Sequence, residues 1–152
     1  MSAEPGPAAS PGPDPTAGAA SDLTFLLDDM VRRVPGTRSV LAVSADGLLM
    51  GVSQGLDRTG GDQLAAVVAG LSSLTRGASR LMGAGEVRQV VVEMDGAFLF
   101  TTSVSDGSVL AVVADISCDI GLVGYEMTLL ASRAGRALTP QLITELRARL
   151  PR

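Results

Sequence analysis

The sequence predicts an α+β domain in which a five-stranded antiparallel sheet is flanked by helices on both faces. Short apolar runs joined by Asp-Gly pairs predict β-hairpins, because this pair favours the backbone of tight hairpin turns. A long segment between the hairpins repeats apolar residues at helical spacing. The predicted strands are apolar on both faces, so helices must cover both sides of the sheet. The expected order is helix, two strands, long helix, three strands and closing helices.

The first twenty residues differ in composition from the rest of the chain. Five of the eight prolines fall within the first fifteen residues, mixed with Gly, Ala and Ser. Such a segment cannot bury enough apolar surface to offset the entropy of ordering it. We therefore expect a disordered tail over residues 1–20, a folded domain over residues 21–137 and a short C-terminal helix over residues 138–152.

The first predicted helix begins at Ser21 or Asp22, since either side chain can cap a helix N-terminus. Its apolar residues share one face, and they are Leu23, Leu26, Leu27, Met30, Val31 and Val34. Pro35-Gly36 ends the helix, because proline interrupts the hydrogen-bond ladder and glycine accepts a left-handed backbone.

Three Asp-Gly pairs organise the five predicted strands into a two-stranded and a three-stranded antiparallel meander. The pairs are Asp46-Gly47, Asp95-Gly96 and Asp106-Gly107. The predicted strands cover residues 39–44, 48–53, 88–94, 97–104 and 108–114. The third strand contains Val90, Val91 and Val92. An apolar strand of this kind lies either inside the sheet or at an edge that pairs with another chain, and the sequence leaves both positions open.

The long helix, expected over residues 62–82, has two distinct faces. Its larger apolar residues form a stripe that we expect to face the sheet, and they are Leu64, Val67, Val68, Leu71, Leu74, Ala78, Leu81 and Met82. Small residues form a second face, and they are Ala66, Ala69, Gly70, Ser73 and Gly77. Glycine inside a helix costs roughly 1 kcal/mol relative to alanine, so the two glycines indicate close approach by another element. Because no other helix of the chain is an obvious candidate, we interpret this face, together with Val90–Val92, as a candidate dimer interface.

Arg76 and Arg80 lie one turn apart on the rim of the small-residue face. A pair of guanidinium groups can bind an acidic or nucleotide-bearing partner. Ordinary solvated surface charge is the alternative interpretation.

The composition excludes most enzyme classes. The chain has no His, all twelve of its cations are arginine, and it has a single cysteine. It therefore lacks an imidazole base, a Schiff-base lysine and a P-loop lysine. Cys118 alone cannot form an internal disulfide, and Asp115 and Asp119 beside it are interpreted as turn and capping residues. We predict a non-enzymatic binding protein with no catalytic, cofactor-binding or metal-binding residues.

Charge and hydropathy limit the partners. A net charge of −4 and a sequence pI of about 4.7 argue against nucleic acid, which requires a basic surface. The first residues lack the pattern of a signal peptide, and no apolar stretch approaches the ~20 residues of a membrane span. We expect a cytoplasmic protein that does not insert into the membrane.

The order and spacing of these elements resemble the Roadblock/LC7 domain family, whose fold is profilin-like. The segments that carry the likeness are SVLAVSADGLLMG at 39–51, DQLAAVVAGLSSL at 62–74, VVVEMDGAFLF at 90–100 and GSVLAVVAD at 107–115. The resemblance covers residues 21–135. The Ala/Gly/Val-rich composition without lysine is similar to that of actinobacterial members encoded in conservon operons.

The resemblance implies dimers in which the long helices pair and the third strands join two sheets. It also implies Ras-like small GTPases as partners, which such domains regulate or scaffold, and no GTP hydrolysis by this chain. In the conservon setting a sensor-kinase-like membrane protein would be a further partner and would recruit the protein to the membrane. We expect a homodimeric regulator or scaffold of a small GTPase in bacterial signalling.

A small-molecule sensor module of PAS or GAF type is the alternative, since it also has a five-stranded antiparallel sheet with helices. Such pockets usually need polar or aromatic groups that orient the ligand. Tyr125 and three phenylalanines are the only aromatic residues of this chain, which favours the GTPase regulator.

Overall fold

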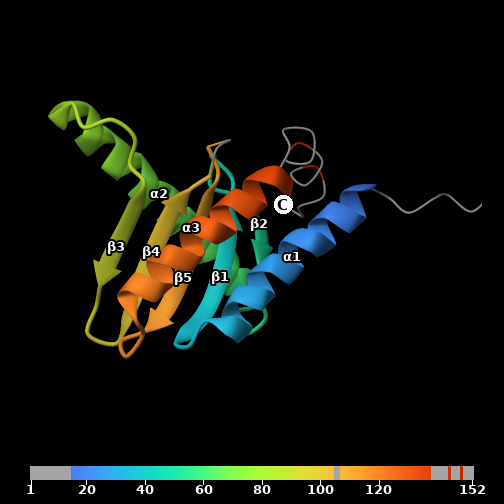
Figure 1. Ribbon diagram of the computed structural model, residues 1–152. Coiled ribbons are helices and arrows are strands. Elements are labelled where there is room, and N and C mark those ends of the chain that lie inside the picture. Colours follow the sequence, from blue (N-terminus) through green and yellow to red (C-terminus); the bar gives the residue numbers. More distant parts are fainter. Residues whose placement is uncertain (1–14, 105–106, 138–143, 145–147, 149–152) are drawn as a thin grey trace, which may run out of the picture.

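The computed structural model describes residues 15–104, 107–137, 144 and 148, and it confirms the predicted fold class (Figure 1). Five strands form one antiparallel sheet in the order β2-β1-β5-β4-β3. Helices α1 and α3 pack on one face of the sheet and α2 packs on the other. The elements are α1 (Pro15–Arg33), β1 (Thr37–Val43), β2 (Leu49–Val52), α2 (Arg58–Met82), β3 (Gln89–Glu93), β4 (Ala97–Ser103), β5 (Val109–Asp115) and α3 (Ile120–Ala137).

Helix α1 begins at Pro15, six residues before the predicted start at Ser21. Proline suits the first turn of a helix because the missing N–H would have no partner there. Three alanines among the next five residues have the highest helix propensity and continue the helix. Residues 1–14 of the predicted tail lie outside the described residues. So does the predicted helix over residues 138–152, except for Thr144 and Ala148, which are both helical.

Two of the three Asp-Gly loops have the predicted left-handed glycine. Gly47 and Gly107 have φ angles of 87° and 91°. In each loop the glycine N–H donates to a carbonyl three residues earlier, Gly47 to Ser44 at 3.0 Å and Gly107 to Val104 at 3.0 Å. In the first of these, Ala45, Asp46 and Gly47 form a three-residue loop in which a turn is followed by a left-handed glycine. The β3–β4 loop differs, because Met94 N–H donates directly to Ala97 O at 2.9 Å and Gly96 does not have a positive φ.

The two predicted meanders join into one sheet because β1 pairs with β5 in antiparallel register, Val40 opposite Val112. This pairing places β2 at one edge and β3 at the other. The strand of Val90–Val92 is therefore an edge strand, which decides between the two positions that the sequence left open.

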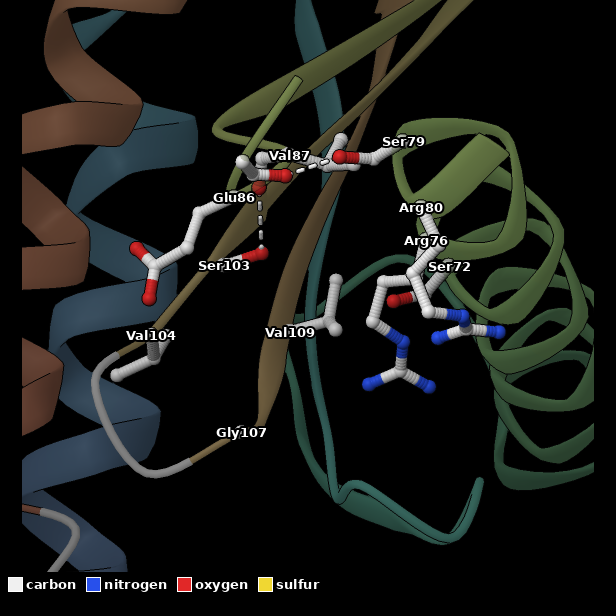
Figure 2. A pocket seen from close by; sticks show the side chains of 11 residues that line it. Ser72, Arg76, Ser79, Arg80, Glu86, Val87, Ser103, Val104, Gly107 and Val109 are labelled. Atoms are coloured by element: carbon white, nitrogen blue, oxygen red, sulfur yellow. Dashed lines mark hydrogen bonds between the residues drawn. The ribbon is translucent and has the colours of Figure 1, made fainter. Parts of the chain in front are cut away.

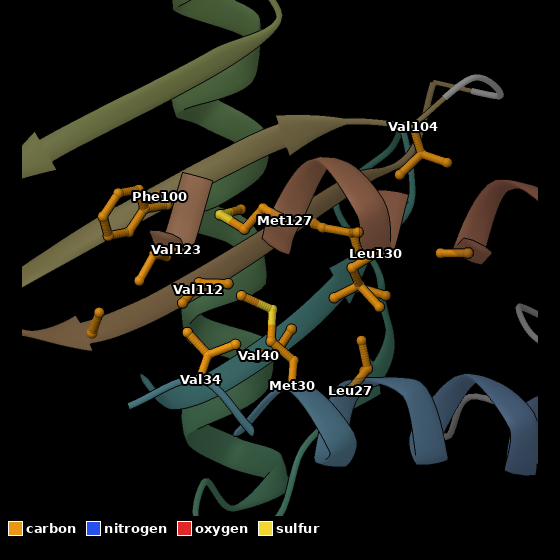
Figure 3. Packing of buried hydrophobic residues seen from close by; sticks show 14 of the residues in the cluster. Leu27, Met30, Val34, Val40, Phe100, Val104, Val112, Val123, Met127 and Leu130 are labelled. Atoms are coloured by element: carbon orange, nitrogen blue, oxygen red, sulfur yellow. The ribbon is translucent and has the colours of Figure 1, made fainter. Parts of the chain in front are cut away.

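The hydrophobic core consists of two clusters separated by the sheet. The larger cluster fills the space between the sheet and helices α1 and α3, and it includes Phe100 of β4, Met127 of α3 and Leu27 of α1 (Figure 3). The smaller cluster lies under α2, where Ala65 and Val68 are fully buried. Strand residues alternate between the two clusters, as the period of two in a β-strand requires.

Gly36 follows α1 in the chain and packs against Cys118, which lies just before α3. Its φ is 85°, and Asp115 N–H donates to its carbonyl at 2.7 Å. A Cβ at this position would lie 2.9 Å from Cβ and 3.2 Å from Cα of Cys118. Both the backbone conformation and the packing therefore require glycine.

We expect Gly36→Ala to lower the free energy of unfolding by about 2 kcal/mol or more, from a strained left-handed backbone and overpacking against Cys118. Urea denaturation measures the change. Gly18→Ala is the matched control: no described atom lies within 4 Å of a Cβ there, so it should be neutral or slightly stabilising. An equal effect of the two substitutions would contradict this account of Gly36.

Candidate functional site

The N-terminal half of α2 rests closely on the sheet. Asp57 caps the helix, its carboxylate accepting from Gly60 N–H at 2.7 Å. Gly61 is buried, and a Cβ there would lie 2.8 Å from Cδ2 of Leu49, so the helix backbone comes close to β2. The helix begins at Arg58, four residues before the predicted start, and packs on β1, β2 and β5.

The C-terminal half of α2 extends past the sheet, and here the sequence-based assignment of the apolar stripe is wrong (Figure 1). Val67, Leu74 and Leu81 were expected to face the sheet, but their exposed fractions are 57%, 76% and 92%. Val67 lies in the first half of the helix and is exposed because it is on the outer side, next to the buried Val68. For Leu74 and Leu81 the physical reason is length. Twenty-five helical residues span roughly 38 Å, whereas a seven-residue strand spans roughly 23 Å. Only the first half of the helix can therefore pack on the sheet of its own chain.

The exposed side of α2 has a regular pattern. Val67, Leu74 and Leu81 are seven residues apart, with Gly70 and Gly77 between them, and we call these five residues the α2 ridge. No described atom lies within 4 Å of a Cβ on Gly70, and at Gly77 only the guanidinium of Arg80 does, at 3.9 Å. The ridge thus alternates large apolar side chains with open spaces, which is the pattern of helices that pack knobs into holes.

The small residues predicted as a dimer face divide into two groups. Ala66, Gly70 and Ser73 are exposed and Gly77 is half-buried, so they lie on or beside the α2 ridge. Ala69 instead packs within its own chain, because its Cβ lies 3.1 Å from the position of a Cβ on Gly47 in the β1–β2 loop. The spacing of the large residues does not identify the outer side of α2, because Leu64 and Leu71, which pack under the helix, are also seven residues apart.

Strand β3 lies beside the overhanging part of α2. Within the described residues it pairs only with β4, Val91 opposite Phe100. Val91 is 44% exposed on the face of α1 and α3, while Val90 and Val92 are half-buried on the face of α2. An apolar edge strand with a free row of backbone groups is a template for pairing with another chain.

Arg76 and Arg80 line a pocket of about 570 Å³ on the inner side of the overhang (Figure 2). The opposite wall includes Val87, Ser103 and Val109. The ion pairs among the described residues lie elsewhere, for example Arg33 with Glu126 at 3.4 Å between α1 and α3, and none of them includes Arg76 or Arg80.

Cys118 and its acidic neighbours serve structural roles. Asp119 caps α3 by accepting from Leu122 N–H at 3.1 Å, and Asp115 pairs with Arg38. Burial raises the pKa of the Cys118 thiol, and the negative charges of Asp115 and Asp119 raise it further. In the described part of the chain, no three His, Cys, Asp or Glu residues are grouped as metal ligands, and no helix is both long and apolar enough to cross a membrane.

Comparison with known proteins gives consistent matches. A family model described as the Roadblock/LC7 domain matches residues 23–114. A solved Roadblock/LC7 domain from Streptomyces avermitilis is 42% identical, covering 72% of this chain and 92% of that chain with a TM-score of 0.69. A second domain from this organism is 31% identical, covering 73% and 96% with a TM-score of 0.61. Myxococcus xanthus MglB, at 21% identity, shares the fold over 76% of this chain and 94% of that chain with a TM-score of 0.71. No curated protein matches the chain.

We expect the Cys118 thiol to react with iodoacetamide at pH 8 several-fold more slowly than a free cysteine, because the raised pKa lowers the thiolate fraction. The folded state favours the protonated thiol, so this contribution to stability is complete below the unfolded pKa and is lost as pH rises through the folded one. Mass spectrometry of the alkylated protein gives the rate, and unfolding in urea should restore the ordinary rate. A rate in the native protein equal to that of free cysteine would contradict the prediction.

Proposed function

Because the chain belongs to the Roadblock/LC7 domain family, we propose that it is a homodimeric, non-enzymatic regulator or scaffold of a Ras-like small GTPase in bacterial signalling. The observation that carries the proposal is the α2 ridge, which is exposed next to the free edge of β3. Family membership supports the class of partner, and the missing P-loop lysine supports a role in which the GTPase, and not this chain, binds the nucleotide.

The dimer joins two copies through β3. In an antiparallel pair related by a two-fold axis perpendicular to the sheet, equivalent residues keep the same face. If the pair is centred on Val91, Gln89 of each copy lies opposite Glu93 of the other copy. A side-chain amide then lies next to a carboxylate at both ends of the strand pair. Antiparallel pairing gives each edge strand the backbone partners that it lacks.

The same arrangement covers the α2 ridge. Because α2 extends past its own sheet on the side of β3, in the dimer its C-terminal half lies over the second copy. Leu74, near the middle of the ridge, then packs into the open space beside Gly70 or Gly77 of the second α2. Burial of Val67, Leu74 and Leu81 in this way contributes roughly 1.5–3 kcal/mol for each side chain.

The GTPase contacts are assigned to Arg76 and Arg80. Neither guanidinium has a carboxylate partner among the described residues, so both are available for charge-assisted hydrogen bonds with acidic groups of the GTPase. Regulation requires different affinities for the two nucleotide states, since a ligand shifts a switch only through differential binding. A sensor-kinase-like membrane protein is the proposed second partner and would recruit this cytoplasmic regulator to the membrane.

We expect Leu74→Arg to convert the dimer to a monomer, because it places a charge in the centre of the interface. Light scattering at micromolar concentration should give about 31 kDa for the native chain, twice 15.5 kDa, and half of that for the variant. Leu74 is 76% exposed in the single chain, so circular dichroism should be unchanged. Tyr125→Arg, at an exposed position on α3, is the matched control and should stay dimeric. A monomeric native chain, or a dimeric Leu74→Arg variant, would contradict the interface.

We expect calorimetry with the Ras-like GTPase encoded nearest in the genome to show at least tenfold tighter binding to one nucleotide state, about 1.4 kcal/mol. The titration compares GDP with a non-hydrolysable GTP analogue. The double variant Arg76→Gln/Arg80→Gln should weaken binding roughly tenfold through lost charge-assisted hydrogen bonds, whereas Arg133→Gln on α3 should not. Equal affinity for both states would leave a scaffold and no regulator, and no binding in either state would reject the proposal.

A further inference from the structure

The pocket at the overhang of α2 has the size of a small-molecule site. Its volume of about 570 Å³ lies within the range of roughly 300–1,000 Å³ that is usual for such sites. The C-terminal half of α2 forms one wall with Ser72, Arg76 and Arg80. Val104 at the end of β4 and Val109 at the start of β5 give the pocket an aliphatic surface.

The two guanidinium groups of the pocket lie on the same wall and extend in the same direction (Figure 2). Nη2 of Arg80 lies 3.9 Å from the position of a Cβ on Gly77, so this side chain extends back along the helix toward Arg76. Two neighbouring positive charges repel each other. No ion pair among the described residues relieves this repulsion, and a bound dianion would reverse it.

Hydrogen bonds hold the opposite wall in place before any ligand binds. Ser103 Oγ donates to Val87 O at 3.1 Å, and Ser79 Oγ donates to Gly85 O. These two bonds attach the segment before β3 to β4 on one side and to α2 on the other. Glu86 lies in the same segment, and its carboxylate points away from the two arginines (Figure 2).

We propose that this pocket binds a small phosphate ester that carries hydroxyl groups, the class of the sugar phosphates. The phosphate lies between Arg76 and Arg80, and the hydroxylated carbon part lies toward Ser103 and the valines. A phosphate monoester carries a charge of about −1.5 to −2 at neutral pH and three terminal oxygens, which match two guanidiniums of total charge +2. One guanidinium fork would already satisfy a carboxylate, which has two oxygens.

The lining residues also restrict the carbon part of the ligand. The described lining holds no aromatic side chain on which a nucleobase would stack. It holds instead serine hydroxyls, of which those of Ser79 and Ser103 already donate within the protein and can accept hydrogen bonds from the hydroxyl groups of a ligand. A hydroxylated aliphatic chain or ring fits these groups.

The test is calorimetry with the isolated full-length protein and glucose 6-phosphate, in the absence of any GTPase. We expect saturable binding at millimolar ligand or below, at least tenfold tighter than that of inorganic phosphate, glucose or gluconate. Arg76→Gln/Arg80→Gln should weaken binding at least tenfold, and Arg133→Gln should leave it unchanged.

Amide chemical shifts of Val87, Ser103 and Val109 locate the ligand, and we expect them to move on titration. No saturable binding, equal binding of inorganic phosphate or gluconate, or full binding by the double variant would each overturn the proposal. The ligand occupies the same two guanidiniums that the proposed function assigns to the GTPase, so the two would compete for them. Because the titration contains no GTPase, failure here would leave the proposed regulatory function standing, and failure of GTPase binding would leave this site standing.

Discussion

An antiparallel sheet that is apolar on both faces is the constraint on which the rest of this structure depends. Water must be excluded from both sides, so helices are needed on both. Two helices, α1 and α3, lie side by side on one face, where Phe100, Met127 and Leu27 are almost completely buried. Only α2 lies on the other face. Five strands spaced by roughly 4.8 Å extend over about 19 Å, nearly twice the diameter of one helix, so α2 cannot cover this face alone.

The incomplete cover explains why both candidate surfaces lie at the same end of α2. Where the helix leaves the sheet, its outer side exposes the α2 ridge and its inner side leaves a space above the ends of β4 and β5. A second copy can cover the first surface, because that surface is apolar and adjoins an edge strand. The second surface contains Arg76 and Arg80 and remains polar. The same overhang thus gives one apolar surface suited to a second copy of the chain and one concave cationic surface suited to anionic groups, either of the GTPase or of a small ligand.

Local patterns in the sequence predicted the element order, the ends of the strands to within two residues and two of the three left-handed loop glycines, because these features depend on residues close together in the chain. The sequence could not predict that β3 lies at the edge of the sheet. This position follows from the pairing of β1 with β5, which are some seventy residues apart in the sequence. The assignment of Leu74 failed for a different reason. A leucine at helical spacing has the same chemistry whether it faces its own sheet or a second copy, and only the length of α2 relative to the sheet distinguishes the two.

Arginine and lysine would act differently at positions 76 and 80. Two lysines held this close could relieve their repulsion by releasing a proton, because burial and a like charge lower the pKa of an ammonium group. An arginine side chain offers no such release of a proton in proteins, and water or an anion relieves the repulsion between two neighbouring guanidiniums instead. The planar donors of a guanidinium match the oxygens of a phosphate in pairs, whereas an ammonium acts as a point charge. A wall with two arginines and no acidic partner among the described residues therefore selects for the geometry of an anion as well as for its charge.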